Sequence, residues 1–227
     1  YHQDLGYSSL LSLGFNVGYA FKNIDFTRFH FENQWTGKFF DASIPNGENF
    51  LFNKINYLDI QTGLNYAYFP SSNMYLNAGV SLMHLNKPKE SFFGNDSSNR
   101  VPIRSNFFLN ASIKLNDQWI INPNAYYSYQ AGSSELVGGM MAQYNLSGDG
   151  ETQLIGGLYY RYNDAAVAMI GLEFNNIRIA FTYDATTSSL RSYNAGRGAA
   201  EFSLIKLGEY INTAGLSQTR CPSFKND

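Results

Sequence analysis

Apolar and polar residues alternate with a period of two along most of the chain. From Leu11 to Phe21, every odd position is apolar and every even position is small or polar. Because successive side chains of a strand point to opposite faces, this pattern predicts a strand with one apolar and one polar face. The pattern returns in about ten segments, most of them near the roughly 9–11 residues that a tilted transmembrane strand needs. The predicted strands are 11–21, 58–68, 74–82, 103–115, 119–130, 134–146, 152–162, 165–174, 177–184 and 199–210.

The two faces differ enough in chemistry to be assigned. In a membrane barrel the apolar face meets lipid and the polar face meets the lumen. We therefore expect an inward set of small polar residues, namely Ser12, Asn16, Gln61, Asn65, Asn77, Ser81, Asn106 and Asn110. The expected lipid-facing set is Leu13, Phe15, Leu64, Val80, Leu109 and Ile113. Tyrosine and tryptophan gather at the strand ends, where a ring with one wet and one oily edge suits the membrane interface.

Composition supports this interpretation. Charged residues make up 15% of the chain and aromatic residues 16%, whereas soluble domains carry about 25% charged residues. A mean hydropathy of −0.28 fits a greasy face and a polar face that average out. The formal charge of −2 gives no basic footprint for nucleic acid. The longest apolar run, 165–172, is far shorter than the roughly 20 residues of a transmembrane helix.

The connections between the predicted strands sort by length. Bacterial outer-membrane barrels have short periplasmic turns and longer outer loops. With the C-terminus in the periplasm, the short connections fall inside and every long one falls outside. The inner connections are 70–72, 116–118, 147–151 and 175–176, and the outer ones are 22–54, 85–102, 131–133, 163–164 and 185–198. A soluble β-sandwich is the alternative that the strand spacing suggests, but it would not need all its long loops to lie on one side.

Candidate catalytic groups are sparse. The histidines are His2, His30 and His84, and Ser81 lies three residues before His84 on the opposite face of a strand. An interface or loop-anchoring role for His84 is the stronger interpretation. Carboxylates on the strands are expected to pair with lumen arginines; they are Asp59, Glu135, Glu173, Asp184 and Glu201, with Arg104, Arg161 and Arg178. Cys221 stands alone, so we expect no internal disulfide and no cysteine-based metal site. Because no convincing catalytic constellation is found, we also expect no metal, no cofactor and no enzymatic activity.

Short motifs follow one another along the chain, and the last of them, Cys221–Phe224, reads Cys-Pro-Ser-Phe. The others are Gly63–Tyr66, Tyr75–Ser81, His84–Pro88, Asn122-Pro123, Tyr160–Ala165, Thr182–Leu190 and Gly198–Glu201. In this order they resemble the PorP/SprF family of type IX secretion system outer-membrane proteins, which closes on Cys-Pro-x-Phe. Ala200 departs from the family pattern, which usually has His there.

The resemblance implies a role in secretion without catalysis. It implies about four further upstream strands and a full barrel of about fourteen. It also implies that the chain binds or anchors a secreted surface protein that carries a type IX sorting domain, such as a gliding-motility adhesin, and contacts other secretion components. A passive porin or small-solute transport barrel is the alternative. We expect a barrel over 1–210, a periplasmic tail over 211–227, outer-membrane lipid around it, and no nucleic acid.

The candidate site lies where strands leave the membrane toward the outer loops. Asp184, Thr186 and Ser188 open the loop that follows the strand 177–184, and Glu201 begins the strand that returns. Short polar side chains of this kind hold a loop through side-chain-to-backbone bonds, and a loop held in this way is suited to grip a partner. The family-like motifs add Arg161, Asp164 and His84 to this partner-binding or loop-anchoring set.

Overall fold

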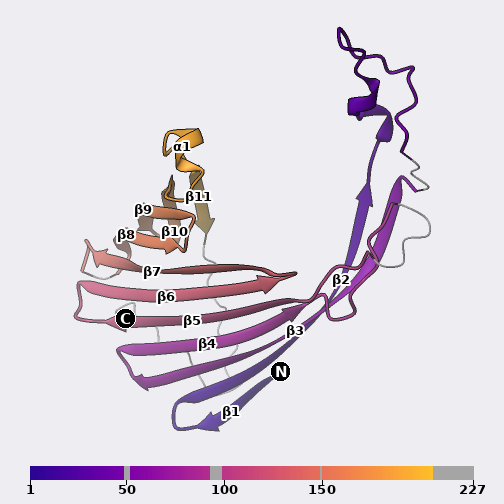
Figure 1. Cartoon of the computed structure of the whole chain (residues 1–227). Helices are drawn as coiled ribbons and strands as arrows, with labels where there is room; N and C mark the ends of the chain where they lie inside the picture. Colours follow the sequence, from indigo (N-terminus) through magenta and orange to yellow (C-terminus); the bar gives the residue numbers. More distant parts are fainter. Residues whose placement is uncertain (49–51, 93–98, 149, 207–227) are drawn as a thin grey trace. The chain divides into compact units, whose positions relative to one another are not determined.

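A computed structural model of the chain describes residues 1–48, 52–92, 99–148 and 150–206. Within them, eleven antiparallel strands form one sheet whose strand order follows the chain (Figure 1). The predicted all-β, up-and-down architecture is confirmed. The strands are β1 (His2–Gly6), β2 (Ser9–Asn23), β3 (Lys54–Ser71), β4 (Met74–Met83), β5 (Arg104–Lys114), β6 (Trp119–Gln130), β7 (Ser133–Asn145), β8 (Thr152–Arg161), β9 (Ala165–Phe174), β10 (Ile177–Thr186) and β11 (Ala200–Lys206).

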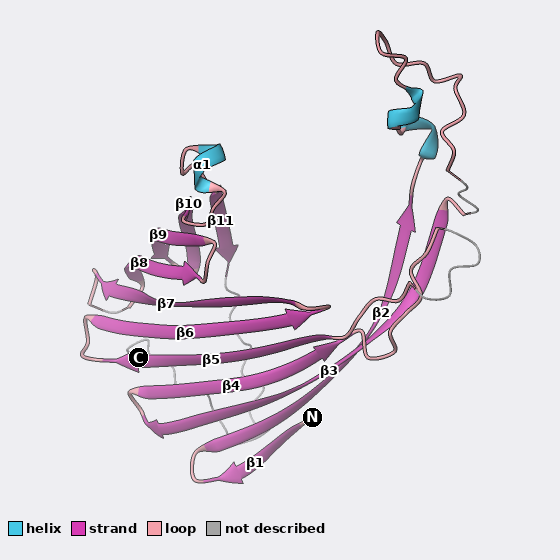
Figure 2. Ribbon diagram, viewed as in Figure 1, coloured by secondary structure: helices cyan, strands magenta, loops and turns pink. Residues whose placement is uncertain are grey.

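Helical structure is minor, as Figure 2 shows. The 3-10 turns η1 (Phe26–Arg28) and η2 (Glu32–Gln34) follow β2, and the single helical turn α1 (Arg191–Asn194) lies between β10 and β11. None of the helices in the described part of the chain is long and apolar enough to cross a membrane.

The chain divides into two compact units. The first unit comprises residues 1–14, 63–81 and 105–227, described as far as 206; the second comprises 15–62 and 82–104. The first therefore holds β1, β6 to β11 and most of β4 and β5. The second holds the two longest connections, 24–53 and 84–103.

One strand was not predicted. Residues 2–6 form β1, which pairs with β2, so the described residues form eleven strands where about ten were expected. The turn between them is Tyr7-Ser8, both of which have positive φ. The last strand is described only as far as Lys206, so the tail 211–227 and Cys221 lie outside the described residues.

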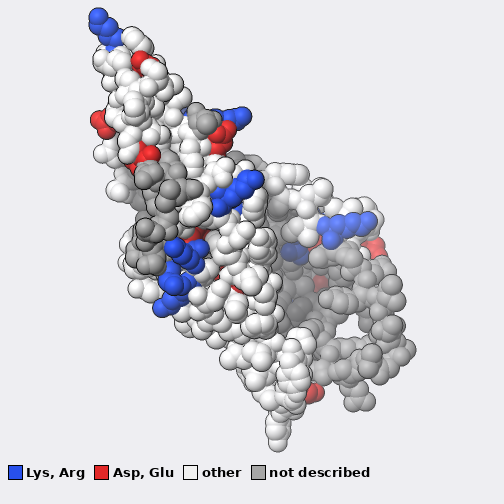
Figure 3. Space-filling view, turned by 90° about the vertical axis from the view of Figure 1, so that its right-hand side faces the viewer, with Lys and Arg blue, Asp and Glu red and all other residues white. Residues whose placement is uncertain are grey.

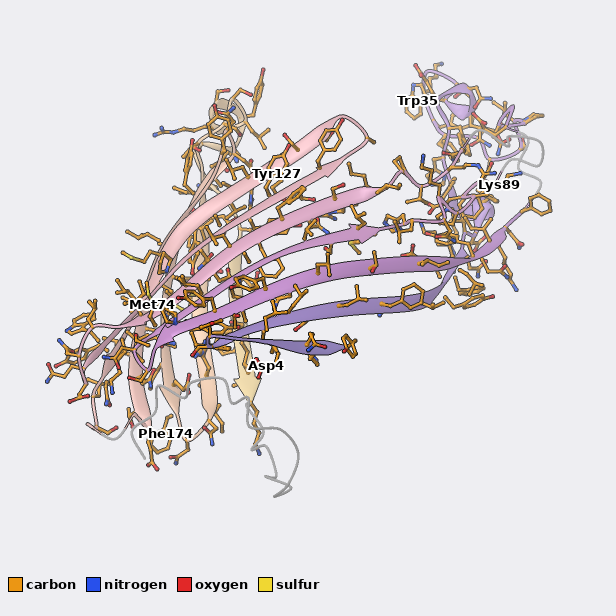
Figure 4. The ribbon with its side chains drawn as sticks, turned by 90° about the horizontal axis from the view of Figure 1, so that it is seen from below. Asp4, Trp35, Met74, Lys89, Tyr127 and Phe174 are labelled. Atoms are coloured by element: carbon orange, nitrogen blue, oxygen red, sulfur yellow. The ribbon has the colours of Figure 1, made fainter. Side chains whose placement is uncertain are left out.

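Exposure separates the two faces on several strands as alternation predicts, whereas every residue of β4 is half-buried and Asn16, expected to face inward, is exposed. On β5, Leu109 is 59% exposed whereas Asn106 is 8% exposed. The expected lipid-facing residues Leu13, Phe15 and Leu64 are likewise exposed. In Figure 4 side chains stand on both sides of the strands, with Met74 and Phe174 beside the short turns that precede β4 and follow β9. In the view of Figure 3, uncharged residues cover most of the surface that the described residues form.

The inward face of the first unit is held together by amides, hydroxyls and glycines. The Asn106 side chain donates to Ser81 at 3.1 Å and accepts from the Tyr126 hydroxyl at 2.9 Å. This chain of bonds links β4, β5 and β6. Glycine also lets an aromatic ring lie across a strand: the Phe108 ring covers Gly79 so closely that no Cβ would fit there. The inner face is therefore partly aromatic, which the asparagine-rich pattern did not predict.

In the second unit, the connection 24–53 is built around a buried glutamine. The Gln34 side chain donates to the Ile44 carbonyl at 2.9 Å and accepts from the Phe31 N–H at 3.2 Å. The ring of Phe26 meets that of Phe92, from the connection 84–103, edge to face at 5.9 Å. The two long connections of this unit therefore pack against each other through aromatic rings.

Candidate functional site

Arg161, the last residue of β8, gathers three carboxylates from neighbouring elements. Its guanidinium donates to Asp164 at 2.8 Å and to Asp184 of β10 at 3.0 Å. Its Nε lies 3.3 Å from a carboxylate oxygen of Glu135 on β7, a distance for an ion pair but without hydrogen-bond alignment. Because a planar guanidinium offers several donors in a fixed fork, one arginine can hold groups from β7, β10 and the β8–β9 turn together.

The connection 187–199 is tied to this cluster by backbone bonds. The N–H groups of Thr187 and Ser188 both donate to the Asp164 carbonyl, at 2.8 and 3.0 Å. The Asp184 N–H donates to the Ala199 carbonyl at 2.9 Å, closing the base of the loop. The loop is therefore fastened both to the β8–β9 turn and to the start of β11.

Side chains brace the loop from within. The Thr186 hydroxyl donates to the Arg197 carbonyl at 3.0 Å and accepts from the Asn194 amide at 2.9 Å. Asn194 also accepts from the Gly196 N–H at 3.0 Å. Gly198 passes so close to the backbone of Asp184 that a Cβ there would overlap the Asp184 carbonyl. Only glycine therefore fits at this crossing.

The braced loop displays apolar surface. Tyr193 of α1 is 88% exposed, and Leu190, its N-cap residue, is also exposed. Neighbouring Arg191 is exposed as well. Tyrosine and arginine are enriched among residues that dominate protein–protein binding, so this surface has the composition of a contact site for protein.

His84 belongs to the second unit, whereas Arg161 and the connection 187–199 belong to the first. The Nδ1 of His84 is 2.9 Å from a carboxylate oxygen of Asp59, and the Gln61 amide donates to the other oxygen at 2.9 Å. Asn86 follows in the same connection; its side chain donates to the Leu58 carbonyl at 2.7 Å and accepts from the Ile60 N–H at 3.2 Å. His84 and Asn86 thus fasten the start of the connection 84–103 to β3.

A second tie within this unit centres on Glu90. Its carboxylate is paired with the Lys22 ammonium of β2 and accepts from the Tyr57 hydroxyl at 2.8 Å. The hydrogen bond from Lys22 is the main cause that lowers the pKa of the Glu90 carboxyl; partial burial opposes it and the bond from Tyr57 adds to it. The connection 84–103 is therefore held to both β2 and β3.

The expected set of site residues is brought together in part. Arg161, Asp164, Asp184, Thr186 and Ser188 meet around one loop. Two members of the set lie elsewhere. Glu201 sits exposed on β11 opposite Thr182, and His84 belongs to the second unit.

Some residues that hold the two connections in place were not predicted from the sequence. Asn194 and Gly198 complete the loop, and the signal for them was local: an Asn-Ala-Gly sequence at the end of a helical turn, and a glycine two residues before a strand. Lys22 and Glu90, 68 positions apart, carried no such signal.

Comparison with known proteins places the chain in a family. No curated protein matches it significantly. Residues 1–204 match the family model described as type IX secretion system membrane protein PorP/SprF. That range includes every strand described apart from the end of β11, and it contains the Arg161 cluster and its loop. The chain therefore belongs to the PorP/SprF family, the membrane proteins of the type IX secretion system.

Proposed function

We propose that this chain is a non-enzymatic barrel component of the type IX secretion system in the outer membrane, and that it binds a secreted surface protein through its long loops. The observation that carries the proposal is the connection 187–199, which is fastened at its base yet exposes Leu190 and Tyr193. An ordered loop loses less conformational entropy on binding than a loose one, so its contacts give more affinity.

The proposal also fixes which end of the sheet faces the cell exterior. In the first unit, the connection 187–199 lies at one end of the strands and the turns 7–8, 72–73 and 175–176 lie at the other, because an odd number of strand crossings separates it from each of them. Short turns belong on the periplasmic side of outer-membrane barrels and long loops outside, so the loop 187–199 would meet partners at the cell surface.

Sidedness is testable by cysteine labelling of intact cells. Ser192→Cys, on the loop, and Ser72→Cys, on a short turn, are both exposed positions, made in a Cys221→Ser background. An impermeant maleimide should label the cysteine at 192 directly and that at 72 only after the outer membrane is permeabilised. The reverse result would invert the topology and remove the loop from the cell surface.

Partner binding is tested with point variants on the loop. Tyr193→Ala combined with Leu190→Ser should leave the barrel assembled, because both side chains are exposed, and should cost about 2 kcal/mol of partner affinity if they anchor the contact. Tyr7→Ala is the matched control, since Tyr7 is an equally exposed tyrosine on a short turn. The measurement is the amount of each secreted surface protein retained on cells.

Deleting 188–194 is the stronger version of the same test. Loss or shedding of one surface protein, with the barrel still assembled, would support the proposal. If all secreted proteins stay on the surface and only the uptake of a small solute changes, the chain is a transport barrel and the proposal is wrong.

A further inference from the structure

The outward face of β6 to β9 carries an apolar groove of about 470 Å³. This volume falls within the range of about 300–1,000 Å³ typical of small-molecule sites. Its floor is formed by Ala142 of β7 and Gly156 of β8, which are paired across the two strands. Its walls are large apolar or aromatic side chains: Trp119, Met140, Tyr144, Leu154, Leu158 and Ile170.

Gly156 has no structural need to be glycine. A Cβ built on it meets no atom within 4 Å, and its φ lies outside the left-handed region. Gly139 and Gly171 differ, because a Cβ on either would overlap a neighbouring backbone carbonyl. Glycine weakens a strand interior, so at Gly156 the missing side chain has one visible consequence, which is the open space of the groove.

The groove is continuous with the lipid-facing surface of the sheet. Leu158 is 72% exposed and Ile170 60% exposed, as expected for side chains that meet hydrocarbon. At one end, Trp119 and Tyr144 pack together with ring centroids 4.8 Å apart. These rings lie beside the short turns 115–118 and 146–151, and aromatic pairs at strand ends mark the boundary between lipid tails and headgroups.

We propose that this groove binds one acyl chain of a membrane phospholipid, with the headgroup beside Trp119 and Tyr144. A flexible hydrocarbon chain can fill the space over Gly156 and regain the dispersion contacts that a rigid neighbour would leave unmade. The lining supplies apolar contact almost throughout and no charged side chain, which suits a hydrocarbon tail. The inference rests on the chain being a membrane protein of its family and is independent of partner binding by the loops.

The two tryptophans of the chain make the site measurable. In a Trp35→Phe background, Trp119 is the sole tryptophan and lines the groove. The purified protein in detergent is titrated with a phospholipid that carries bromine on its acyl chains, and quenching of Trp119 is recorded. Quenching should saturate, and native mass spectrometry should count one retained phospholipid per chain.

Filling the groove should abolish this behaviour. Gly156→Leu should raise the half-saturation concentration about tenfold or more, equivalent to about 1.4 kcal/mol, while the control Ala166→Leu should change it by less than about twofold. Ala166 is exposed on the outward face of β9 and lies outside the groove lining. Ala142→Leu fills the same floor from β7 and replaces Gly156→Leu if that variant fails to assemble.

Two results would overturn the inference. One is quenching that rises without saturation or is unchanged in both groove variants, as expected for lipid that exchanges freely over the whole face. The other is a photo-crosslinking residue at position 158 that captures a protein in native membranes and not a phospholipid.

Discussion

Two adjacent glycines of β7, Gly138 and Gly139, should respond oppositely to the same substitution. Gly139 faces inward, where the Tyr159 ring of β8 lies over it and the Tyr159 hydroxyl accepts from the Asn124 amide of β6 at 3.3 Å. A Cβ at Gly139 would overlap the Leu158 carbonyl and lie 2.7 Å from the Tyr159 Cα. Gly138 faces outward, and its nearest neighbour would be the Asn124 carbonyl at 4.0 Å.

The expected magnitudes follow from these contacts. Overpacking against backbone costs about 1–3 kcal/mol, and losing the Asn124–Tyr159 bond costs about 1 kcal/mol more. Alanine is favoured over glycine in a strand by roughly 0.5–1 kcal/mol. Gly139→Ala should therefore lower the free energy of unfolding by about 2 kcal/mol, whereas Gly138→Ala should leave it unchanged or raise it slightly.

The assay is urea unfolding of the protein folded into lipid vesicles, followed by tryptophan fluorescence. The free energy of unfolding falls linearly with urea concentration, so the two variants are compared by their midpoints at equal slopes. Tyr159→Phe in the otherwise wild-type protein removes the hydrogen bond from Asn124 and leaves Gly139 in place. Its midpoint therefore separates the effect of the lost hydrogen bond from that of the steric overlap. Equal midpoints for Gly138→Ala and Gly139→Ala would refute the reasoning that the ring over Gly139 locks β6, β7 and β8 together.

Two further changes test the assignment of faces and the hold on a loop. Leu109→Arg should cost about 2–4 kcal/mol on the lipid face and impair assembly, whereas Asn110→Arg should be tolerated better. The measurement is the folded fraction, seen as heat-dependent migration on a gel. Equal loss of folded protein in both variants would contradict the assignment of Leu109 to the lipid face and Asn110 to the inward face. Because the pKa of Glu90 in the folded protein lies below its ordinary value of 4.5, the tie to Lys22 should stabilise the connection 84–103 above about pH 4.5 and be lost as pH falls through the folded pKa. The ion pair between Glu90 and Lys22 is partly exposed, so its loss should cost about 1 kcal/mol or less of stability. The connection should become more sensitive to protease in acid, and Glu90→Gln should remove that pH dependence. An unchanged pH dependence in Glu90→Gln would assign the effect to another group.

Strand number shows where sequence patterns succeed and where they stop. The short connection 175–176 was predicted, and both of its asparagines adopt positive φ, which asparagine tolerates. The Tyr7-Ser8 turn has the same backbone but a residue pair with no such preference. Without a turn signal, the five residues of β1 carried too little alternation to be recognised as a separate strand.

The candidate site was predictable only where its members are close in sequence or share a motif. Arg161 and Asp164 are three residues apart and meet across a tight turn. Glu135 and Asp184 reach Arg161 only because the register pairs β7 with β8 and β9 with β10, which alternation alone does not fix. Arg178 and Glu173 pair as expected for carboxylates and arginines of the lumen face, because they flank the two-residue turn 175–176.

The inward face of β8 to β10 bears on whether this barrel conducts or anchors. Charges gather at its two ends: the Arg161 cluster by the long loops, and Arg178 with the buried Glu173 by the short turns. Between them most side chains are small or apolar, apart from Tyr159 and Thr182; Ile155 is 1% exposed, and a Cβ on Gly157 would lie 3.0 Å from Met169. A path for polar solutes needs hydrogen-bonding groups along its length, because solutes that shed water must be compensated. This stretch of the described strands has few, which supports the proposal that β8 to β10 form a wall behind the fastened loop of an anchoring barrel.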